Sequence, residues 1–399
     1  MAAVHSTPFP ISLDPLSSEF SKLSTKSEST IYGIRVTTVA PILDPEEIKK
    51  ALFETAYEPS ESFWGESQAS YKKPAEDPLP EGFPAKVSGP HIWDGKTLIN
   101  EPDRWLHTLT AEEVEDVDQA IKHFISLALG FSAITQETFP LKVLDKALSK
   151  AVDEIINGIG LRIIRGLPVQ KYDRKAQIIA FAGISAYIGE HRYRQGPSAA
   201  AIAHLRDLTA GPRLLLKVRP LEIRSSIPMR GKSSCHRASY RITDKPTRNR
   251  DIIGLLTLGK AEKGGLSQLS SVGQLYNTFS DSRRDILRTL ASKYYSRYDP
   301  EGSPIIHYTE DRAIAQYGRR GFFPFFEDQS ALPDNIPALT KEQHLALDAL
   351  HFTAEAAALD IDLRPGDLEF FNNLSIFHAR TASEDSPENT YVTHSAFCA

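Results

Sequence analysis

The sequence predicts an α+β fold in which amphipathic helices flank a core of short apolar strands. Three observations indicate this class. Apolar residues recur at helical spacing in several segments, and short apolar runs bounded by Gly, Pro or Asn turns are typical of buried strands. The two kinds of segment alternate without a regular strand–helix–strand rhythm. The sequence has no Gly-rich phosphate loop, so the pattern also argues against a nucleotide-binding fold.

Four segments carry the helical pattern. A helix is predicted over Glu46–Tyr57, because the Asp-Pro pair just before it is a typical start signal. A second helix is predicted over Leu141–Ile156, where the apolar residues form one stripe and a Gly-rich stop follows. Two further amphipathic segments cover Lys175–Ile188 and Glu342–Leu359.

The clearest signal lies in the last forty residues of the chain. A Pro-Gly-Asp turn at residues 365–367 leads into an apolar strand, and an Asn-Asn turn follows at residues 372–373. His378 lies on the next predicted strand. A strand holds its side chains in fixed directions, so this imidazole is a candidate metal ligand. The alternative is a core or strand-edge histidine that binds no metal.

Two other segments predict strands of the same core. Asp251–Leu258 is a buried strand, followed by a Gly-Gly turn at residues 264–265 and a short helix that carries Tyr276. Ser267 comes just after that turn, as an ordinary turn hydroxyl or as a ligand contact. A further apolar strand is predicted over Gly160–Pro168, directly after a helix.

These motifs, together with the segment from Trp93-Asp94-Gly95 to Trp105, resemble the TauD/TfdA-like (taurine hydroxylase-like) Fe(II)/2-oxoglutarate dioxygenases, especially their fungal branch. The resemblance covers residues 80–210 and 251–390. It implies a double-stranded β-helix (jelly-roll) core flanked by helices. It also implies Fe(II) as the metal and 2-oxoglutarate as cosubstrate.

The resemblance assigns roles to two of the candidate residues. His378 takes the place of the third iron ligand, and Ser267 takes the place of the hydroxyl that helps to hold 2-oxoglutarate. A small-molecule substrate would be hydroxylated or desaturated, with iron activating oxygen while 2-oxoglutarate is decarboxylated. Fungal members often act in secondary metabolism, which makes biosynthetic tailoring the expected role by analogy.

The chain departs from the family where the first two iron ligands are expected. Iron in this family is held by two His and one carboxylate. The first His falls on Pro246 and the carboxylate falls on Arg248. Proline offers no ligand, and a guanidinium repels a cation. His236 is the nearby alternative metal ligand, paired with Asp244, although it also fits a histidine of a surface loop.

A second departure concerns the arginine that clamps 2-oxoglutarate in the family. The chain has Tyr391 in that region, and no arginine follows Arg380. Arg380 lies two residues after His378, so along a strand it shares the face of His378. We therefore take Arg380 as a candidate cosubstrate-binding residue that differs from the family's clamp.

Residues 211–250 form an atypical basic insert or loop. They carry eleven basic side chains and two acidic ones, hence a net charge of +9 in a chain whose net charge is −5. Such a block is typical of a patch for nucleic acid or an acidic partner, but its single aromatic residue gives little support for base stacking. An out-of-frame or wrongly spliced translation is the other hypothesis, for this block and for residues 391–399, and transcript sequencing tests it.

Composition sets the remaining expectations. The 399 residues exceed a usual single domain, and we expect a flexible lead-in over residues 1–30 before one domain over residues 31–399. Two cysteines exclude a disulfide framework and indicate a reducing, cytoplasmic compartment. No long apolar run predicts a membrane span, and the net charge argues against general nucleic-acid binding. Nothing in the sequence predicts an oligomeric state.

Three functions therefore remain open at the level of sequence. The first is a 2-oxoglutarate-dependent dioxygenase acting on a small molecule. The second is a catalytically dead homologue that keeps the fold as a binding protein, because the first His, the carboxylate and the clamp Arg are missing. A basic-patch binding module is a third and weaker reading.

Overall fold

A computed structural model describes residues 59–189, 192–193, 202–206, 224–225, 252–296, 299–322, 336–337, 339–384 and 392–398, and the strands 24–31 and 34–41. The chain divides into two compact units, residues 1–58 and 59–399. In the first unit, β1 (Ser24–Ile31) and β2 (Ile34–Pro41) pair in an antiparallel hairpin. The predicted helix over Glu46–Tyr57 lies outside the described residues.

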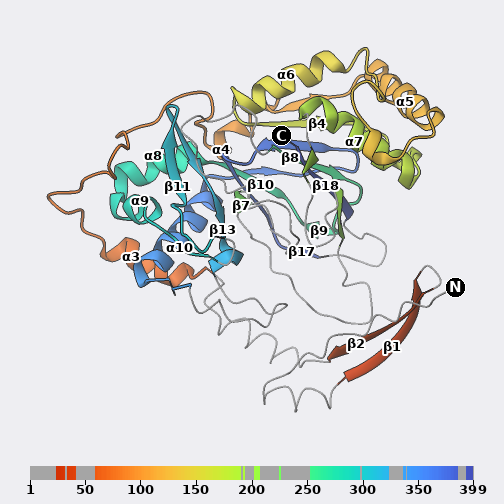
Figure 1. Ribbon diagram of the computed structural model, residues 1–399. Coiled ribbons are helices and arrows are strands. Elements are labelled where there is room, and N and C mark those ends of the chain that lie inside the picture. The colour runs from red at the N-terminus through yellow and green to blue at the C-terminus, as the bar shows by residue number, and fades with distance from the viewer. Residues whose placement is uncertain are drawn as a thin grey trace. The chain divides into compact units, whose positions relative to one another are not determined.

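Two main sheets form the centre of the second unit (Figure 1). The seven-stranded sheet has the order β3-β4-β15-β8-β18-β5, with β6 also paired to β18, and the five-stranded sheet has the order β13-β7-β16-β10-β14. Every neighbouring pair is antiparallel except β3 and β4, which are parallel. The strands of the larger sheet are β3 (Leu106–Thr108), β4 (Leu161–Arg165), β5 (Arg192–Tyr193), β6 (Ile202–Arg206), β8 (Ile252–Thr257), β15 (Leu368–Asn372) and β18 (Val392–Cys398).

The five-stranded sheet and two separate strand pairs complete the described strands of this unit. The strands of the five-stranded sheet are β7 (Arg224–Ser225), β10 (Ser267–Ser271), β13 (Tyr317–Gly318), β14 (Leu359–Ile361) and β16 (Ile376–Arg380). Separate antiparallel pairs are formed by β11 (Ile306–Thr309) with β12 (Arg312–Ala315), and by β9 (Lys263–Gly264) with β17 (Ser383–Glu384).

Helices cover the outer sides of both sheets, as Figure 1 shows. The group beside β4 and β8 is α5 (Ala111–Ser126), α6 (Asp145–Ile156) and α7 (Arg174–Ile188). The group beside β10 and β13 is α3 (Glu61–Ser70), α8 (Val272–Ser282), α9 (Arg284–Leu290) and α10 (Lys341–Ala356). The short helix α4 (Gly95–Leu98) contacts β14. This mixture of helices and antiparallel sheets confirms the predicted α+β class.

Two apolar layers hold the strands and helices together. One layer lies between the two sheets and joins Ile253 and Phe371 of the larger sheet to Leu269 and Ile376 of the smaller one. The other lies between the larger sheet and α5–α7. Side chains of β8 and β15 contribute to both layers, because successive side chains of a strand point to opposite faces of the sheet. The central strands β4, β8 and β15 are therefore apolar on both faces.

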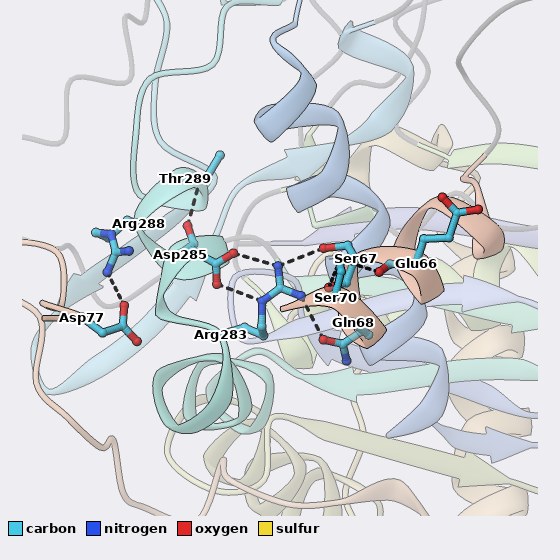
Figure 2. A network of polar contacts seen from close by, with 9 residues as sticks. All are labelled: Glu66, Ser67, Gln68, Ser70, Asp77, Arg283, Asp285, Arg288 and Thr289. Atoms are coloured by element: carbon cyan, nitrogen blue, oxygen red, sulfur yellow. Dashed lines mark hydrogen bonds and ion pairs between the residues drawn. The ribbon is translucent and has the colours of Figure 1, made fainter. Parts of the chain in front are cut away.

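A buried arginine fastens α3 to the junction of α8 and α9 (Figure 2). The guanidinium of Arg283 donates to both carboxylate oxygens of Asp285, at 2.9 and 2.7 Å. It also donates to Gln68 and Ser67 of α3, at 2.9 and 3.2 Å. Nearby, Arg288 of α9 binds Asp77 at 2.7 Å, so the loop after α3 is tied to the same helix pair.

The helices predicted in the second unit are confirmed, with small shifts at their ends. The helix expected from Leu141 begins at Asp145. The carboxylate of Asp116 accepts the backbone N–H groups of residues 142–144 at 2.8–3.1 Å, which fixes this segment as a turn before the helix. The last predicted helix ends at Ala356, and Leu359 already belongs to β14.

Other expectations stay as predictions. In the basic block 211–250 the described part is β7 alone, and the rest lies outside the described residues. The lead-in over residues 1–30 and the domain limits are likewise not tested. None of the described helices is both long and apolar enough to span a membrane.

Candidate active site

The Pro-Gly-Asp turn anchors the start of β15. Gly366 has φ +94°, and a Cβ at this position would lie 2.0 Å from the carbonyl oxygen of Leu167. Its turn is closed by the Asp367 carboxylate, which accepts the backbone N–H of Arg364 at 2.9 Å. The same carboxylate accepts from the guanidinium of Arg165 at 2.7–3.1 Å. This motif is thus explained by backbone geometry and by a partly buried ion pair.

The Gly-Gly turn at residues 264–265 brings Arg380 close to the chain. Both glycines have positive φ, +68° and +71°, and a Cβ on Gly264 would lie 1.9 Å from the carbonyl oxygen of Ala382. A Cβ on Gly265 would lie 3.3 Å from the Arg380 guanidinium, which donates to the Gly265 carbonyl at 2.8 Å. Glycine is favoured here because the backbone adopts the left-handed region and packs tightly.

The Asn-Asn turn sends the chain from the larger sheet into the smaller one. The side-chain oxygen of Asn372 accepts the N–H of Leu374 at 3.1 Å, and its carbonyl accepts the N–H of Ser375 at 3.1 Å. This local hydrogen bonding is typical of Asn in tight turns. β16 then runs antiparallel to β10 and carries His378.

The register of β10 and β16 places three sequence-predicted site residues on one face. Ser267 lies opposite Arg380, and Leu269 lies opposite His378. Directly opposed residues of an antiparallel pair point to the same side of the sheet. Leu269 belongs to the apolar layer between the sheets, so Ser267, His378 and Arg380 share the inner face of the five-stranded sheet.

Side chains of β15 meet this face from the larger sheet. The Ser267 hydroxyl donates to Oε1 of Glu369 at 2.8 Å. The rings of Phe371 and His378 pack with centroids 4.8 Å apart and planes tilted by 47°. Glu369 and Phe371 are two residues apart on one strand and therefore point the same way. Both contacts thus cross the space between the two sheets.

Glu369 is a buried carboxyl in apolar surroundings. It is 1% exposed, and its neighbours across the ladder are Ile163 and Leu255. Its second oxygen, Oε2, has no hydrogen-bond partner among the described residues. Burial raises the pKa of Glu369 to about 7, against the lowering influence of the Ser267 hydrogen bond and of the Arg380 guanidinium.

Sequence reasoning missed Glu369, although a signal was present. The strand reads Leu368-Glu369-Phe370-Phe371, with a charged residue inside an apolar run. A strand that is buried on both faces has no solvent side for a carboxylate. The one acidic residue of such a strand is a functional candidate, because burying a charged group costs free energy unless it is paired and hydrogen-bonded.

The described residues do not by themselves complete an iron site. Within the described ranges, no group of three or more His, Cys, Asp or Glu side chains is placed to hold a metal ion. His378 is a predicted ligand inside those ranges, whereas His236 lies outside the described residues. Pro246, Arg248 and Tyr391, which stand where the family has functional residues, lie outside them as well.

A small hollow lies on the helix side of β10, and its lining includes His378. It has a volume of ≈ 10 Å³, and its other lining residues include Gln268, Ser270 and Glu355. Ser270 donates to the carbonyl of Ala354 in α10 at 2.5 Å, which shows that this face packs against the helix. Ligand pockets usually measure about 300–1,000 Å³, so the hollow is too small to be the substrate site.

The family model of the taurine catabolism dioxygenase TauD, TfdA family matches residues 125–394. The chain therefore belongs to the TauD/TfdA family, and the resemblance seen in its motifs is confirmed. By family it is a 2-oxoglutarate-dependent dioxygenase, an oxidoreductase class in which iron is the metal.

Two curated relatives extend this result. The taurine hydroxylase-like protein SAT17 of the fungus Stachybotrys chartarum is 28% identical over 302 residues, covering 74% of this chain and 74% of that protein. The FR-33289 synthase of Streptomyces rubellomurinus is 21% identical over 315 residues, covering 76% of this chain and 86% of that protein.

A solved structure shares the fold. An asparagine oxygenase, crystallised with Fe(II), 2S,3S-3-hydroxyasparagine and succinate, aligns with a TM-score of 0.53. The match covers 74% of this chain and 93% of that chain at 14% identity. At this level of identity the likeness concerns the arrangement of strands and helices.

Proposed function

We propose that the protein is an Fe(II)/2-oxoglutarate-dependent oxygenase that hydroxylates or desaturates a small molecule in secondary metabolism. We also propose that its two facing sheets are the double-stranded β-helix (jelly-roll) of the family. Family membership supports the reaction class, and the FR-33289 synthase supports a biosynthetic setting. A cytoplasmic location remains part of this proposal.

One structural observation carries the proposal. Ser267, His378 and Arg380 come from two strands that are far apart in sequence, yet they share the inner face of one sheet. That face combines a hydroxyl donor, an imidazole and a guanidinium. A hydroxyl and a guanidinium can bind the carboxylate of 2-oxoglutarate, and an imidazole can ligate iron.

In this assignment His378 would be one iron ligand, and Ser267 and Arg380 would contact 2-oxoglutarate. Iron, when bound, supplies the oxidising chemistry of the family. The protein's own residues orient the cosubstrate: Ser267 donates one hydrogen bond, and Arg380 contributes positive charge. The apolar layer beneath them excludes water from the ligand's inner side.

A second candidate function is a binding protein without oxygenase activity. It is favoured by the sequence at two expected ligand positions, which hold Pro246 and Arg248. Under this reading the inner face would still bind a dicarboxylate or a related small molecule, without iron.

Anaerobic spectroscopy separates the two candidates. Addition of Fe(II) and 2-oxoglutarate to an iron-binding protein should give the visible charge-transfer band of the chelated complex. His378→Ala should abolish the band, whereas His123→Ala, which removes an exposed histidine of α5, should keep it. Folded wild-type protein that shows no band would rule out the oxygenase and leave the binding protein.

A further inference from the structure

We propose that Glu369 couples the binding of an anionic ligand at Ser267 to the uptake of one proton. The inference rests on the proposed role of Ser267 as a contact for the carboxylate of 2-oxoglutarate. It assigns a function to a buried side chain that the proposed chemistry does not otherwise use.

The hydroxyl of Ser267 has one proton to donate. In this structure that proton is directed to Oε1 of Glu369, at 2.8 Å. A ligand carboxylate can only accept hydrogen bonds, so it cannot bind the Ser267 hydroxyl while Ser267 donates its proton to Glu369. Protonation of Glu369 reverses the bond: the carboxyl then donates to Ser267 Oγ, and the hydroxyl proton turns to the ligand.

Charge leads to the same conclusion. A carboxylate bonded to Ser267 would lie one hydroxyl away from Glu369, inside a site where that residue is 1% exposed. Two carboxylates that share a buried site do not both stay ionised, and one of them takes up a proton. Glu369 is the residue that accepts the proton, because burial already raises its pKa to about 7.

The charged and polar groups around Glu369 allow its protonation state to change. β4 and β8 present Ile163 and Leu255, which carry no charge. β10 presents the Ser267 hydroxyl, and β16 presents the guanidinium of Arg380, which favours the ionised form.

On its own strand, Asp367 acts against ionisation of Glu369, although Asp367 is itself paired with Arg165. Burial is the largest influence, and it raises the pKa of Glu369 to about 7. The added proton lies on Oε1, the carboxyl oxygen that is 2.8 Å from Ser267 Oγ. Protonation is therefore accessible near neutral pH.

Isothermal titration calorimetry of 2-oxoglutarate into the full chain tests the coupling. The titration is done anaerobically with Fe(II), at pH 6 and pH 8, in two buffers of different ionisation enthalpy at each pH. We expect uptake of nearly one proton per ligand at pH 8, and an affinity about tenfold lower at pH 8 than at pH 6. Glu369→Gln, which keeps the size but cannot ionise, should show neither effect.

Glu355→Gln is the matched control, because it removes an exposed carboxylate on the helix side of β10. It should keep the wild-type proton uptake. Binding with no proton uptake in the wild type, or with equal uptake in Glu369→Gln, would overturn the coupling and leave the 2-oxoglutarate site intact. No binding by the folded wild type at either pH would instead overturn the cosubstrate site itself, and the coupling with it.

An infrared measurement applies even if Glu369→Gln does not fold. The wild type without ligand should show a protonated-carboxyl C=O band that disappears as the pH rises from 6 to 8. A band present at pH 6 and lost at pH 8 supports titration of a buried carboxyl. A band that persists at pH 8 would overturn the coupling, because Glu369 would then already carry its proton before the ligand binds.

Discussion

Arg283 and Glu369 are both buried ionisable residues, but their charges are stabilised to very different extents. The Arg283 guanidinium is 3% exposed and makes four hydrogen bonds. Its polar and aromatic partners are Ser67, Gln68, Asp285, Trp64 and Tyr71. Glu369 has one hydrogen bond, from Ser267, and one carboxyl oxygen without a described partner.

The difference shows which buried charge serves the fold and which is available for function. A fully partnered charge fixes the position of α3, since moving it would break several bonds at once (Figure 2). A half-partnered carboxyl has a raised pKa and can change its protonation state, which is typical of functional sites. The following predictions test this contrast, from the largest expected effect to the smallest.

Arg283→Ala should lower the free energy of unfolding by about 3–5 kcal/mol, because it leaves Asp285 and the polar groups of α3 without their partner. Urea denaturation measures the change. Arg283→Lys should recover part of it, since the ammonium keeps the charge but loses the two-point contact with Asp285. A loss below about 1 kcal/mol would remove the contrast with Glu369.

Glu369→Gln should change how stability depends on pH. The folded-state pKa of Glu369 is raised from 4.5 to about 7. Its stability contribution is therefore present below the unfolded pKa and is lost as the pH rises through 7. Relative to wild type, the variant should gain roughly 3 kcal/mol between pH 4.5 and pH 8. If the free energy of unfolding changed with pH in the same way in both proteins, Glu369 would ionise in the folded state as it does in water.

Ser267→Ala should weaken 2-oxoglutarate binding by about 2 kcal/mol, the usual worth of a hydrogen bond to a charged group. Calorimetry at pH 6 measures this effect where Glu369 is protonated. Ser267→Thr keeps a hydroxyl and should stay close to wild type. Equal affinity of the alanine and threonine variants would contradict the proposed contact.

Lys260→Ala should change stability by about 0.5 kcal/mol or less, because its ion pair with Asp362 is solvent-exposed. Thermal unfolding at moderate ionic strength measures it. A loss as large as that of Arg283→Ala would mean that burial does not explain the contrast between the two regions.

The sequence predicted the local elements better than the contacts between them. The strand over Asp251–Leu258 and the two turns around β15 were found because glycine, proline and asparagine act locally. The start of α6 was placed too early, because Asp116, 28 residues before Leu144, caps the preceding turn. Such long-range caps leave no periodic signal.

For the candidate site, the sequence likewise predicted individual residues but not the contacts between them. Ser267, His378 and Arg380 were named from motifs, and strand pairing brings them to one face. The partner of Ser267 was missed, since a hydrogen bond across two sheets, 102 residues apart, depends on how the sheets pack. The roles of these residues, and of His236, stay predictions.

A crystal structure of the anaerobic protein with 2-oxoglutarate tests the central claim most directly, namely that a carboxylate binds at the inner face beside Ser267. The account predicts a ligand carboxylate oxygen within hydrogen-bond distance of Ser267 Oγ and near Arg380, with His378 facing the same space. A ligand bound elsewhere, with apolar side chains filling the space beside the Ser267–Glu369 hydrogen bond, would contradict it.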